Sequence, residues 1–446
     1  MLESSNHLAN ISQLLLAKFR HHLNRAFRSL AYCGLVALLT IASPEVGHSA
    51  DGEASSQGTL SLPYGFYNEN FGLAGAYVYA RIGYPQPQSM VLVTGMAGTQ
   101  GAGMLFGLGQ NLRFPGRRSA NLNRLFLDPV FSINYSEDID AFVNGNPSFP
   151  DEDAGSNNSD KDNFVTGDGW DNFFRVNFKY LLPIGHGRNQ IIPRYDVKHG
   201  MLVSGATGGA SFNPLTSGRS FVELRPFYRS QEIDGNDISG DFATNGLDIG
   251  LFWDNRDFPP NPSTGQGLRL KASTDFGLLD SSGSWTVAQL EFDQYFSLGA
   301  TDRFRQRVLA FDFWTADTLS DNSAPAYTGA TLGGLWKLRG YPSQRFNDRA
   351  AIYYGAELRL IPKWNPFDSW PKIQKHVGVE WIQFVPFVEV GRVAPSWNVD
   401  ELHSDMKWVA GGGIRVWAKG FLVRVDLAFS EEGAGIQMMV GHPFQF

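Results

Sequence analysis

The sequence predicts an all-β fold, an antiparallel transmembrane β-barrel of about 16 strands. Three observations support this prediction. The chain ends in an alternating strand that stops on an aromatic residue, its composition is rich in glycine and phenylalanine, and alternating segments recur along most of its length. Each observation is weak alone, because single barrel strands carry little signal, and the prediction rests on their combination.

The terminal segment, residues 435–446, alternates with the period of two that a β-strand imposes. Most of its apolar side chains share one face, interrupted only by His442, and the other face is largely polar and uncharged. Phe444 and Phe446 lie on the apolar face at the end of the chain. A terminal aromatic strand is typical of outer-membrane barrels, whose rings lie at the membrane interface, and we interpret both residues as a terminal assembly signal. A soluble sandwich could also end in an amphipathic strand.

Composition narrows the possible partners. Hydrophobic residues make up 43% and charged residues 18% of the chain, with 49 Gly and 34 Phe, yet the mean hydropathy is -0.21. After residue 50 no apolar run reaches the ~18 residues that a membrane helix needs. Since lipid tolerates only helices and closed sheets, membrane residence requires a barrel, with outer-membrane lipid as its surroundings. A net charge of -7 without a basic tract argues against nucleic acid.

Residues 1–50 resemble an export signal. An apolar run at residues 30–41 follows three arginines, and Ala42 and Ala50 are candidate cleavage positions. A short core helix is the alternative interpretation. The only cysteine, Cys33, lies inside this segment, so cleavage removes any possibility of a disulfide or a thiolate metal site. The three arginines are Arg20, Arg25 and Arg28.

The remaining chain divides into a short segment, residues 51–70, and a barrel, residues 71–446. Alternating strands in the barrel place apolar residues on one face and charged residues of both signs on the other. A closed sheet of about 16 strands has a wide interior that holds water or a plug. We therefore expect the charged faces to line the lumen and the apolar faces to meet lipid. The clearest apolar face comprises Phe421, Val423, Val425, Leu427 and Phe429.

Two long connections and one irregular region complete the predicted topology. Residues 136–169 and 317–349 are long loops, whereas residues 182–188 read as a tight turn. Between about 137 and 245, long and short connections fail to alternate as a barrel requires. The acidic run at residues 151–162 contains oxygen ligands for Ca²⁺, but its spacing fits no known loop and favours a solvated surface. We predict no catalytic residue, no cofactor and no metal site.

Four motifs follow one another in the C-terminal half. The first contains Asp254, Arg256, Asp257 and Gly265. The second contains Leu338, Arg339, Gly340 and Tyr341 and is followed by a strand with Glu357. The third ends at Gly391, and the fourth runs from residue 410 into the terminal strand. In type, order and spacing they resemble the BamA/TamA barrel superfamily, also called the bacterial surface antigen family.

The resemblance implies a 16-strand barrel in the bacterial outer membrane, with the loop that carries Arg339 folded into the lumen. It also implies that this arginine meets an acidic residue of the inner wall. A guanidinium in a partly dry lumen needs a carboxylate, and bidentate pairing fixes its orientation. By alternation Glu389 faces inward, so we name it as the partner, with Asp405 as the second choice.

The function implied by the resemblance is insertion or transport of proteins across the outer membrane, without enzyme activity. Family members that insert or export proteins carry several periplasmic domains before the barrel, and this sequence leaves no room for one. The partner expected during biogenesis is the outer-membrane assembly machinery, and a separate periplasmic protein is a further candidate partner. The alternative is a passive pore or a structural envelope protein without translocation activity.

Overall fold

The computed structural model describes residues 58–68, 71–114, 122–209, 211–235, 239–371, 374 and 378–444. The chain divides into two units, Met1–Glu53 and Ala54–Phe446, and the description below concerns the second. The predicted export signal at residues 1–50 and the terminal Phe446 lie outside the described residues.

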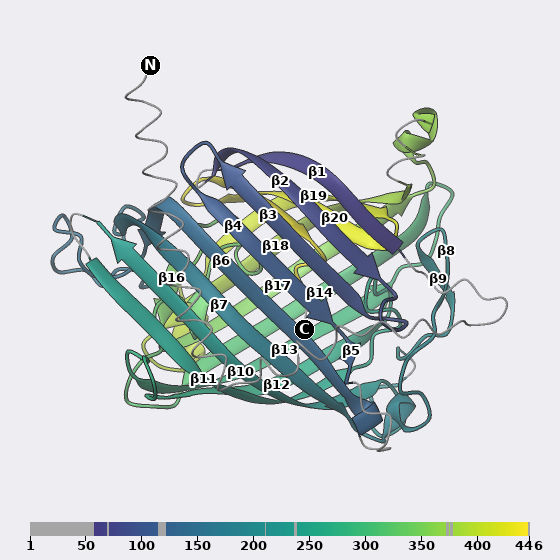
Figure 1. Cartoon of the computed structure of the whole chain (residues 1–446), viewed down its shortest axis with the longest axis horizontal. Helices are drawn as coiled ribbons and strands as arrows, with labels where there is room; N and C mark the ends of the chain where they lie inside the picture. The colour runs from purple at the N-terminus through teal and green to yellow at the C-terminus, as the bar shows by residue number, and fades with distance from the viewer. Residues whose placement is uncertain are drawn as a thin grey trace. The chain divides into compact units, whose positions relative to one another are not determined.

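One 17-stranded sheet dominates the second unit, and every strand pairing in it is antiparallel (Figure 1). Strand β5 (Leu112–Arg113) is a two-residue continuation of β4 along β6, so 17 - 1 = 16 strands follow one another around the barrel wall. The fold class and the strand number expected from sequence are therefore confirmed. The other wall strands, in chain order, are β1 (Gly58–Asn68), β2 (Gly72–Ile82), β3 (Met90–Gly98), β4 (Gly103–Gln110), β6 (Leu125–Ala141), β7 (Val165–Leu181), β10 (Arg219–Asp234), β11 (Ser239–Asp254), β12 (Gly265–Phe276), β13 (Ser284–Ser297), β14 (Phe304–Thr318), β17 (Ala350–Pro362), β18 (Val379–Ala394), β19 (Lys407–Ala418), β20 (Phe421–Ser430) and β21 (Ala434–Val440).

Helices are few and short. The described elements are three 3-10 turns and one α-helix of four residues, and among the described residues no helix is long and apolar enough to span a membrane. These elements are η1 (Leu122–Arg124), η2 (Gly185–Arg188), η3 (Pro366–Ser369) and α4 (Val399–Leu402).

The connections fall at two ends of the barrel wall. We call the end at which β1 begins and β21 finishes the terminal rim, and the opposite end the loop rim. The loop rim carries the long connections 142–164, 319–349 and 395–406. The terminal rim carries mostly shorter ones and two exceptions, residues 363–378 and residues 182–218. Residues 182–218 include a separate hairpin of β8 (Asp196–Lys198) and β9 (Met201–Ser204).

Two sequence expectations about topology were wrong. Residues 51–70 were expected to precede the barrel, but β1 occupies Gly58–Asn68 and pairs with β2 along its whole length. The supposed tight turn at residues 182–188 is the start of the long connection at the terminal rim. Its hairpin forms a separate two-stranded sheet, so this stretch adds no strand to the wall, and loops alternate only when the whole of residues 182–218 is counted as one connection.

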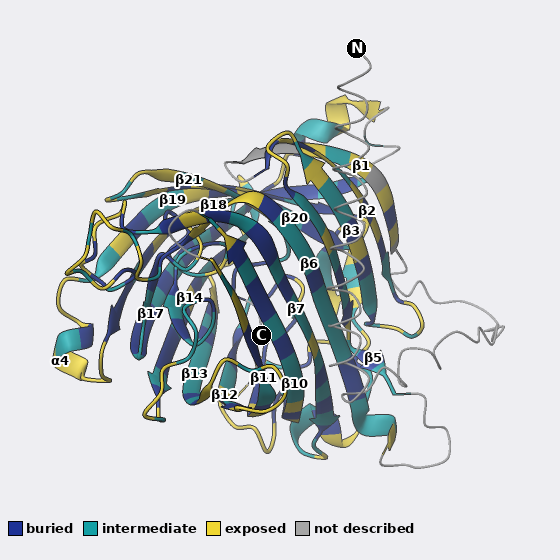
Figure 2. Ribbon diagram, turned by 60° about the vertical axis from the view of Figure 1, so that its left-hand side comes forward, coloured by how far each residue is buried: buried dark blue, intermediate teal, exposed yellow. Residues whose placement is uncertain are grey.

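Alternation along the strands matches the expected division into two faces (Figure 2). On β19, Ile414 is 51% exposed whereas the next residue, Arg415, is fully buried. On β20, Leu427 is 43% exposed and Asp426 is fully buried. The exposed apolar side chains form the outer face, and the buried charged side chains line the lumen, because successive side chains of a strand point to opposite faces.

The seam between the first and last strands is closed by apolar packing. Among the described residues, no hydrogen-bonded pairing joins β1 to β21; β1 pairs with β2, and β21 pairs with β20. Instead, the inward residues Leu60, Val78 and Leu92 of the first strands pack against Phe421, which lies on the outer side of β20. The first strands therefore overlap the last ones at the seam.

A charge placed on the outer face tests this assignment. We expect Ile414→Arg to lower the free energy of unfolding in lipid vesicles by about 2–4 kcal/mol, the cost of an arginine near the bilayer midplane. Ile414→Leu, the control, keeps the site apolar and should unfold at nearly the wild-type urea concentration. Unfolding is followed by tryptophan fluorescence. Equal stability of the two variants would contradict a lipid-facing Ile414.

Candidate functional site in the lumen

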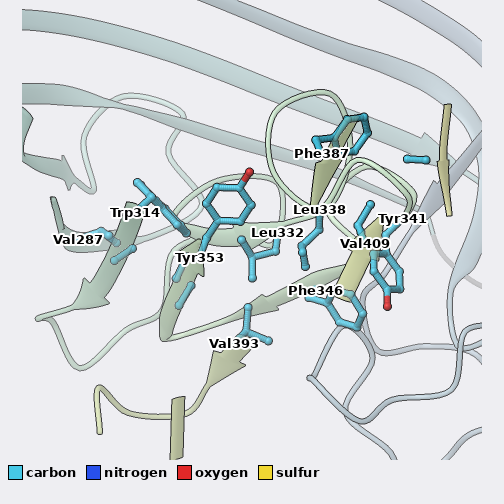
Figure 3. Packing of buried hydrophobic residues seen from close by; sticks show 14 of the residues in the cluster. Val287, Trp314, Leu332, Leu338, Tyr341, Phe346, Tyr353, Phe387, Val393 and Val409 are labelled. Carbon is cyan, nitrogen blue, oxygen red and sulfur yellow. The ribbon is translucent and has the colours of Figure 1, made fainter. Parts of the chain in front are cut away.

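The connection 319–349 folds back into the barrel and packs on its inner wall (Figure 3). It carries a small hairpin of β15 (Ala330–Leu332) and β16 (Phe346–Asp348). Its apolar side chains are almost fully buried against inward residues of β13, β14, β17, β18, β19 and β20. This loop contributes Ala330, Leu332, Leu338, Tyr341 and Phe346 to the cluster.

Arg339 lies at the centre of the site and is fully buried. Its backbone N–H and its Nε both donate to the carboxylate of Glu389, at 2.7 and 2.8 Å. Its Nη1 donates to Asp426 Oδ2 at 2.6 Å, and its Nη2 donates to Glu357 Oε1 at 3.1 Å. The structure thus brings Arg339 to Glu389, and it adds two further carboxylates that the sequence reasoning did not assign as partners.

Other contacts fix the arginine and its partner. The guanidinium carbon lies 3.6 Å from the centroid of the Phe387 ring, and the hydroxyl of Tyr353 donates to Glu389 Oε1 at 2.9 Å. Burial alone lowers the pKa of Arg339, but the neighbouring carboxylates outweigh burial and raise that pKa above its ordinary value. Arg339 therefore stays charged and can hold all three carboxylates.

The buried ionic cluster is larger than one arginine. Glu357 also accepts from Arg415 Nη2 at 2.6 Å and from Arg359 Nε at 2.9 Å, and Arg424 pairs with Asp426. These groups are all at most 1% exposed, so four guanidinium groups face three carboxylates in a dry region. Alternation along β20 places Arg424 and Asp426 on the inward face, and that signal could have identified them from sequence.

The backbone of the loop fits closely against β20. Leu338, not Gly340, adopts a left-handed conformation, with φ of 52°. Gly340 instead lies close to the wall, since a Cβ at this position would come within 3.2 Å of Ser430 and Phe429. Tyr341 is 2% exposed and packs edge-on against Phe346, with ring centroids 5.0 Å apart. Gly391 faces the same cluster through Leu332 and Leu338.

Asp405, the second candidate partner, does not reach Arg339. Its side chain is 78% exposed at the loop rim, and its nearest cation is Arg392, at 3.8 Å. The expectation failed because Asp405 precedes β19 in a connection, so that strand alternation does not determine where it points.

A second long connection, residues 142–164, covers the luminal loop at the loop rim. Arg345 of the luminal loop donates to Ser159 Oγ at 2.9 Å and pairs with Glu432 at 2.8 Å. Asn347 donates to the Phe142 carbonyl at 3.0 Å. The acidic run considered for Ca²⁺ belongs to this connection, and the described residues include no group of three or more His, Cys, Asp or Glu arranged to hold a metal ion.

The first sequence motif lies at the terminal rim, after β11. Arg256 pairs with Asp254 at 2.7 Å, while Asp257 accepts from the backbone and the hydroxyl of Ser263. Gly265 has φ of 95°, and a Cβ there would lie 2.0 Å from the Asn255 carbonyl. The motif therefore builds a compact turn that positions the long connection 182–218 beside it.

Several hydrogen bonds attach that connection to the turn. Ser217 Oγ donates to Asn255 Oδ1 at 2.6 Å, and Asn255 Nδ2 donates to the Ser211 carbonyl at 2.9 Å. The β8–β9 hairpin then packs against inward residues of the wall, with Trp381 Nε1 donating to the Gly200 carbonyl at 3.1 Å. The terminal rim thus has its own inward-packed segment, which sequence reasoning missed because it expected a tight turn there.

The end of the chain differs from the sequence expectation. Strand β21 stops at Val440, and Phe444 is buried against Tyr295, Val308 and Ala310, which are inward residues of β13 and β14. His442 is also buried, with Nδ1 2.8 Å from Arg415 Nη1. Phe444 was expected in the lipid-facing row, but alternation applies only while the strand continues. The role of Phe444 and Phe446 as an assembly signal stays a prediction.

Removing Arg339 should release the luminal loop. Arg339→Ala leaves three carboxylates without their shared cation, and breaking a buried pair costs about 3–5 kcal/mol. Glu389→Ala should cost less, because Arg339 keeps two carboxylates. Proteinase K cleavage within residues 319–349 measures the release. Lys337→Ala, in the same loop, is the control, since its nearest carboxylate is 4.0 Å away. Equal protection in all three variants would contradict this role of Arg339.

Gly200→Val should displace the hairpin at the terminal rim. A Cβ at Gly200 would lie 2.4 Å from Trp381 Nε1 and 2.7 Å from Trp417 Cδ1. Gly299→Val is the matched control, because Gly299 has nearly the same φ, 69° against 68°, with no atom within 4 Å. We expect faster proteolysis of residues 182–218 in Gly200→Val only, with both variants still heat-modifiable on gels. Equally fast proteolysis of residues 182–218 in both variants would contradict the role of the contact between Gly200 and the two tryptophans.

Known proteins were compared with this chain by sequence and by structure. The search of curated proteins gives no match. Among solved structures, BamA from Haemophilus ducreyi lacking POTRA domains 1–3 is similar, with 11% sequence identity, a TM-score of 0.43, and coverage of 87% of this chain and 70% of that one. The model of the Omp85 superfamily domain matches residues 105–444. The chain therefore belongs to the Omp85 superfamily.

Proposed function

We propose that this protein inserts or transports other proteins at the bacterial outer membrane, and that it acts at the seam between β1 and β21. Membership of an outer-membrane protein assembly and translocation family supports the general class. The observation that carries the proposal is the seam itself, where two strand edges meet without a hydrogen-bonded ladder in the described part of the chain.

Unpaired strand edges have a defined chemistry. Each presents a row of N–H and C=O groups that a strand from another chain can pair with. In lipid such groups cannot be left without partners, so an edge that opens toward the bilayer favours the pairing of an incoming strand. The apolar overlap of Leu60, Val78 and Leu92 with Phe421 closes the seam at rest and contains no ladder that must be broken.

Two segments packed inside the barrel count against a passive pore. The loop around Arg339 packs on the inner wall from the loop rim, and the β8–β9 hairpin packs on inward residues near the terminal rim. Both are held by buried contacts, the first by three carboxylates and the second by Trp381. Action at the seam requires neither segment to move.

The proposal implies an orientation and partners. With the long connections outside, as in outer-membrane barrels, the terminal rim faces the periplasm. The protein is itself a client of the outer-membrane assembly machinery during biogenesis. A separate periplasmic protein would deliver substrates to the terminal rim. No enzyme activity is part of this proposal.

A reversible cross-link at the seam tests the proposal. We expect a disulfide between cysteines at Leu92 and Phe421 to stop insertion of an unfolded client barrel into proteoliposomes, and reduction to restore it. The control pair, Ala356→Cys and Val388→Cys, lies directly opposite within the paired wall and should have no effect. Planar-bilayer conductance is measured in parallel. Full insertion with a cross-linked seam would refute the proposal, and steady conductance by the intact chain would favour a pore.

A further inference from the structure

The outer side of the terminal rim carries a group of basic side chains at β14 and β17. Arg305 and Arg307 stand at the start of β14, Arg303 precedes them, and Lys363 follows β17. The exposure of the next residues on β14 shows which way Arg307 points. Val308 and Ala310 are buried on the inward side, whereas Phe311 is 41% exposed on the outer face, so Arg307 shares the outer face with Phe311.

A β-bulge removes Arg305 from the alternation of β14. The register between β14 and β17 shifts between Phe304 and Gln306, so Arg305 has no opposite residue. Gln306 points inward, where Asn261 donates to it at 3.2 Å. Bulges commonly redirect a side chain at the end of a sheet. Arg305 is partly exposed and donates to the Lys363 carbonyl, so it lies beside Lys363 at the edge of the rim.

These cations lack carboxylate partners in the described part of the chain. Arg305 donates to the Lys363 carbonyl at 2.9 Å, and Arg307 donates to the carbonyls of Gly299 and Leu298. No ion pair joins Arg303, Arg305, Arg307 or Lys363 to an acidic side chain of the described residues. Each guanidinium has more donors than these carbonyls occupy, because arginine carries five N–H groups.

An apolar surface continues from the basic group across the wall. Arg307 lies opposite Leu360 of β17, and Leu360 lies opposite Phe384 of β18. The ring of Trp364, 56% exposed, lies over Phe384 with ring centroids 6.2 Å apart. An exposed tryptophan beside apolar side chains is typical of the membrane interface, and arginine next to it lies at the level of lipid headgroups.

We propose that this patch, Arg303, Arg305, Arg307, Lys363 and Trp364, binds the headgroup of an anionic phospholipid, with an acyl chain along Leu360 and Phe384. Charge complementarity selects the ligand, since guanidinium groups bind phosphate through paired hydrogen bonds. The opposite rim has the reverse charge: connection 142–164 holds five acidic residues against Lys161. The inference rests on the proposed membrane orientation, which makes the ligand a lipid of the periplasmic leaflet.

Native mass spectrometry of the folded full chain tests the site. Phosphatidylglycerol and phosphatidylcholine with identical acyl chains are offered at equal concentration, and we expect preferential retention of phosphatidylglycerol. Each basic residue near an anionic lipid contributes about 1 kcal/mol, a factor of about five, so Arg305→Gln with Arg307→Gln should weaken binding on the order of twentyfold. Arg305→Lys with Arg307→Lys keeps the charge but loses the paired hydrogen bonds, so its binding should lie between that of the wild type and that of the double glutamine variant.

Arg349→Gln is the matched control, because Arg349 is an arginine of the loop rim that also donates to backbone carbonyls. It should bind phosphatidylglycerol like the wild type. Equal retention of the two lipids, or unchanged binding in the double glutamine variant, would overturn the proposal. The assay contains no client protein, so it can fail while insertion through the seam succeeds, and the reverse result is equally distinguishable.

Discussion

The contact on which the luminal architecture depends is the one between Arg339 and three carboxylates of the wall. Glu357, Glu389 and Asp426 come from β17, β18 and β20. A single guanidinium therefore bonds to three strands of the wall, in addition to the hydrogen bonds between neighbouring strands. Without Arg339, the wall arginines Arg359, Arg415 and Arg424 still pair with Glu357 and Asp426, but Glu389 loses the guanidinium that pairs with it. A buried carboxylate without a cation is costly, so the loop completes the charge pairing of the wall at Glu389.

This dependence explains why the loop is both polar and apolar. Leu338 and Tyr341, the neighbours of the Arg339–Gly340 pair, are buried with Phe346 and exclude water, which strengthens the ionic contacts. Arg345, a few residues further on, attaches the loop to Ser159 and Glu432 at the rim. Apolar packing and charge pairing thus support each other, and the loss of either would weaken the other.

Sequence reasoning predicted what local patterns determine. Period-two alternation gave the strands and their faces, and it placed Glu389 on the inward side. It failed where alternation ends: Phe444 turns inward after Val440, and Asp405 lies in a connection. It also missed the β8–β9 hairpin, whose two strands are only three and four residues long and pair only with each other. Alternation also places Asp426 on the inward side, as it does Glu389. It does not show that three carboxylates from different strands meet at Arg339, because that depends on the folded positions of the strands.

The polarity of the inner face differs between parts of the wall, and this difference explains how the seam is packed. From β17 to β20 inward positions include arginine and glutamate, whereas Leu60, Val78, Ala80 and Leu92 make the inward face of β1 to β3 apolar. An apolar face would be poorly solvated by a polar lumen, so its burial against Phe421 and Val440 stabilises the overlap of first and last strands. The seam is therefore held by a non-directional contact, which permits sliding and separation more readily than a hydrogen-bonded ladder would. The luminal loop and the β8–β9 hairpin both pack inside the barrel, so the proposed insertion would use the one place in the wall where the described strands are joined by packing and not by a ladder.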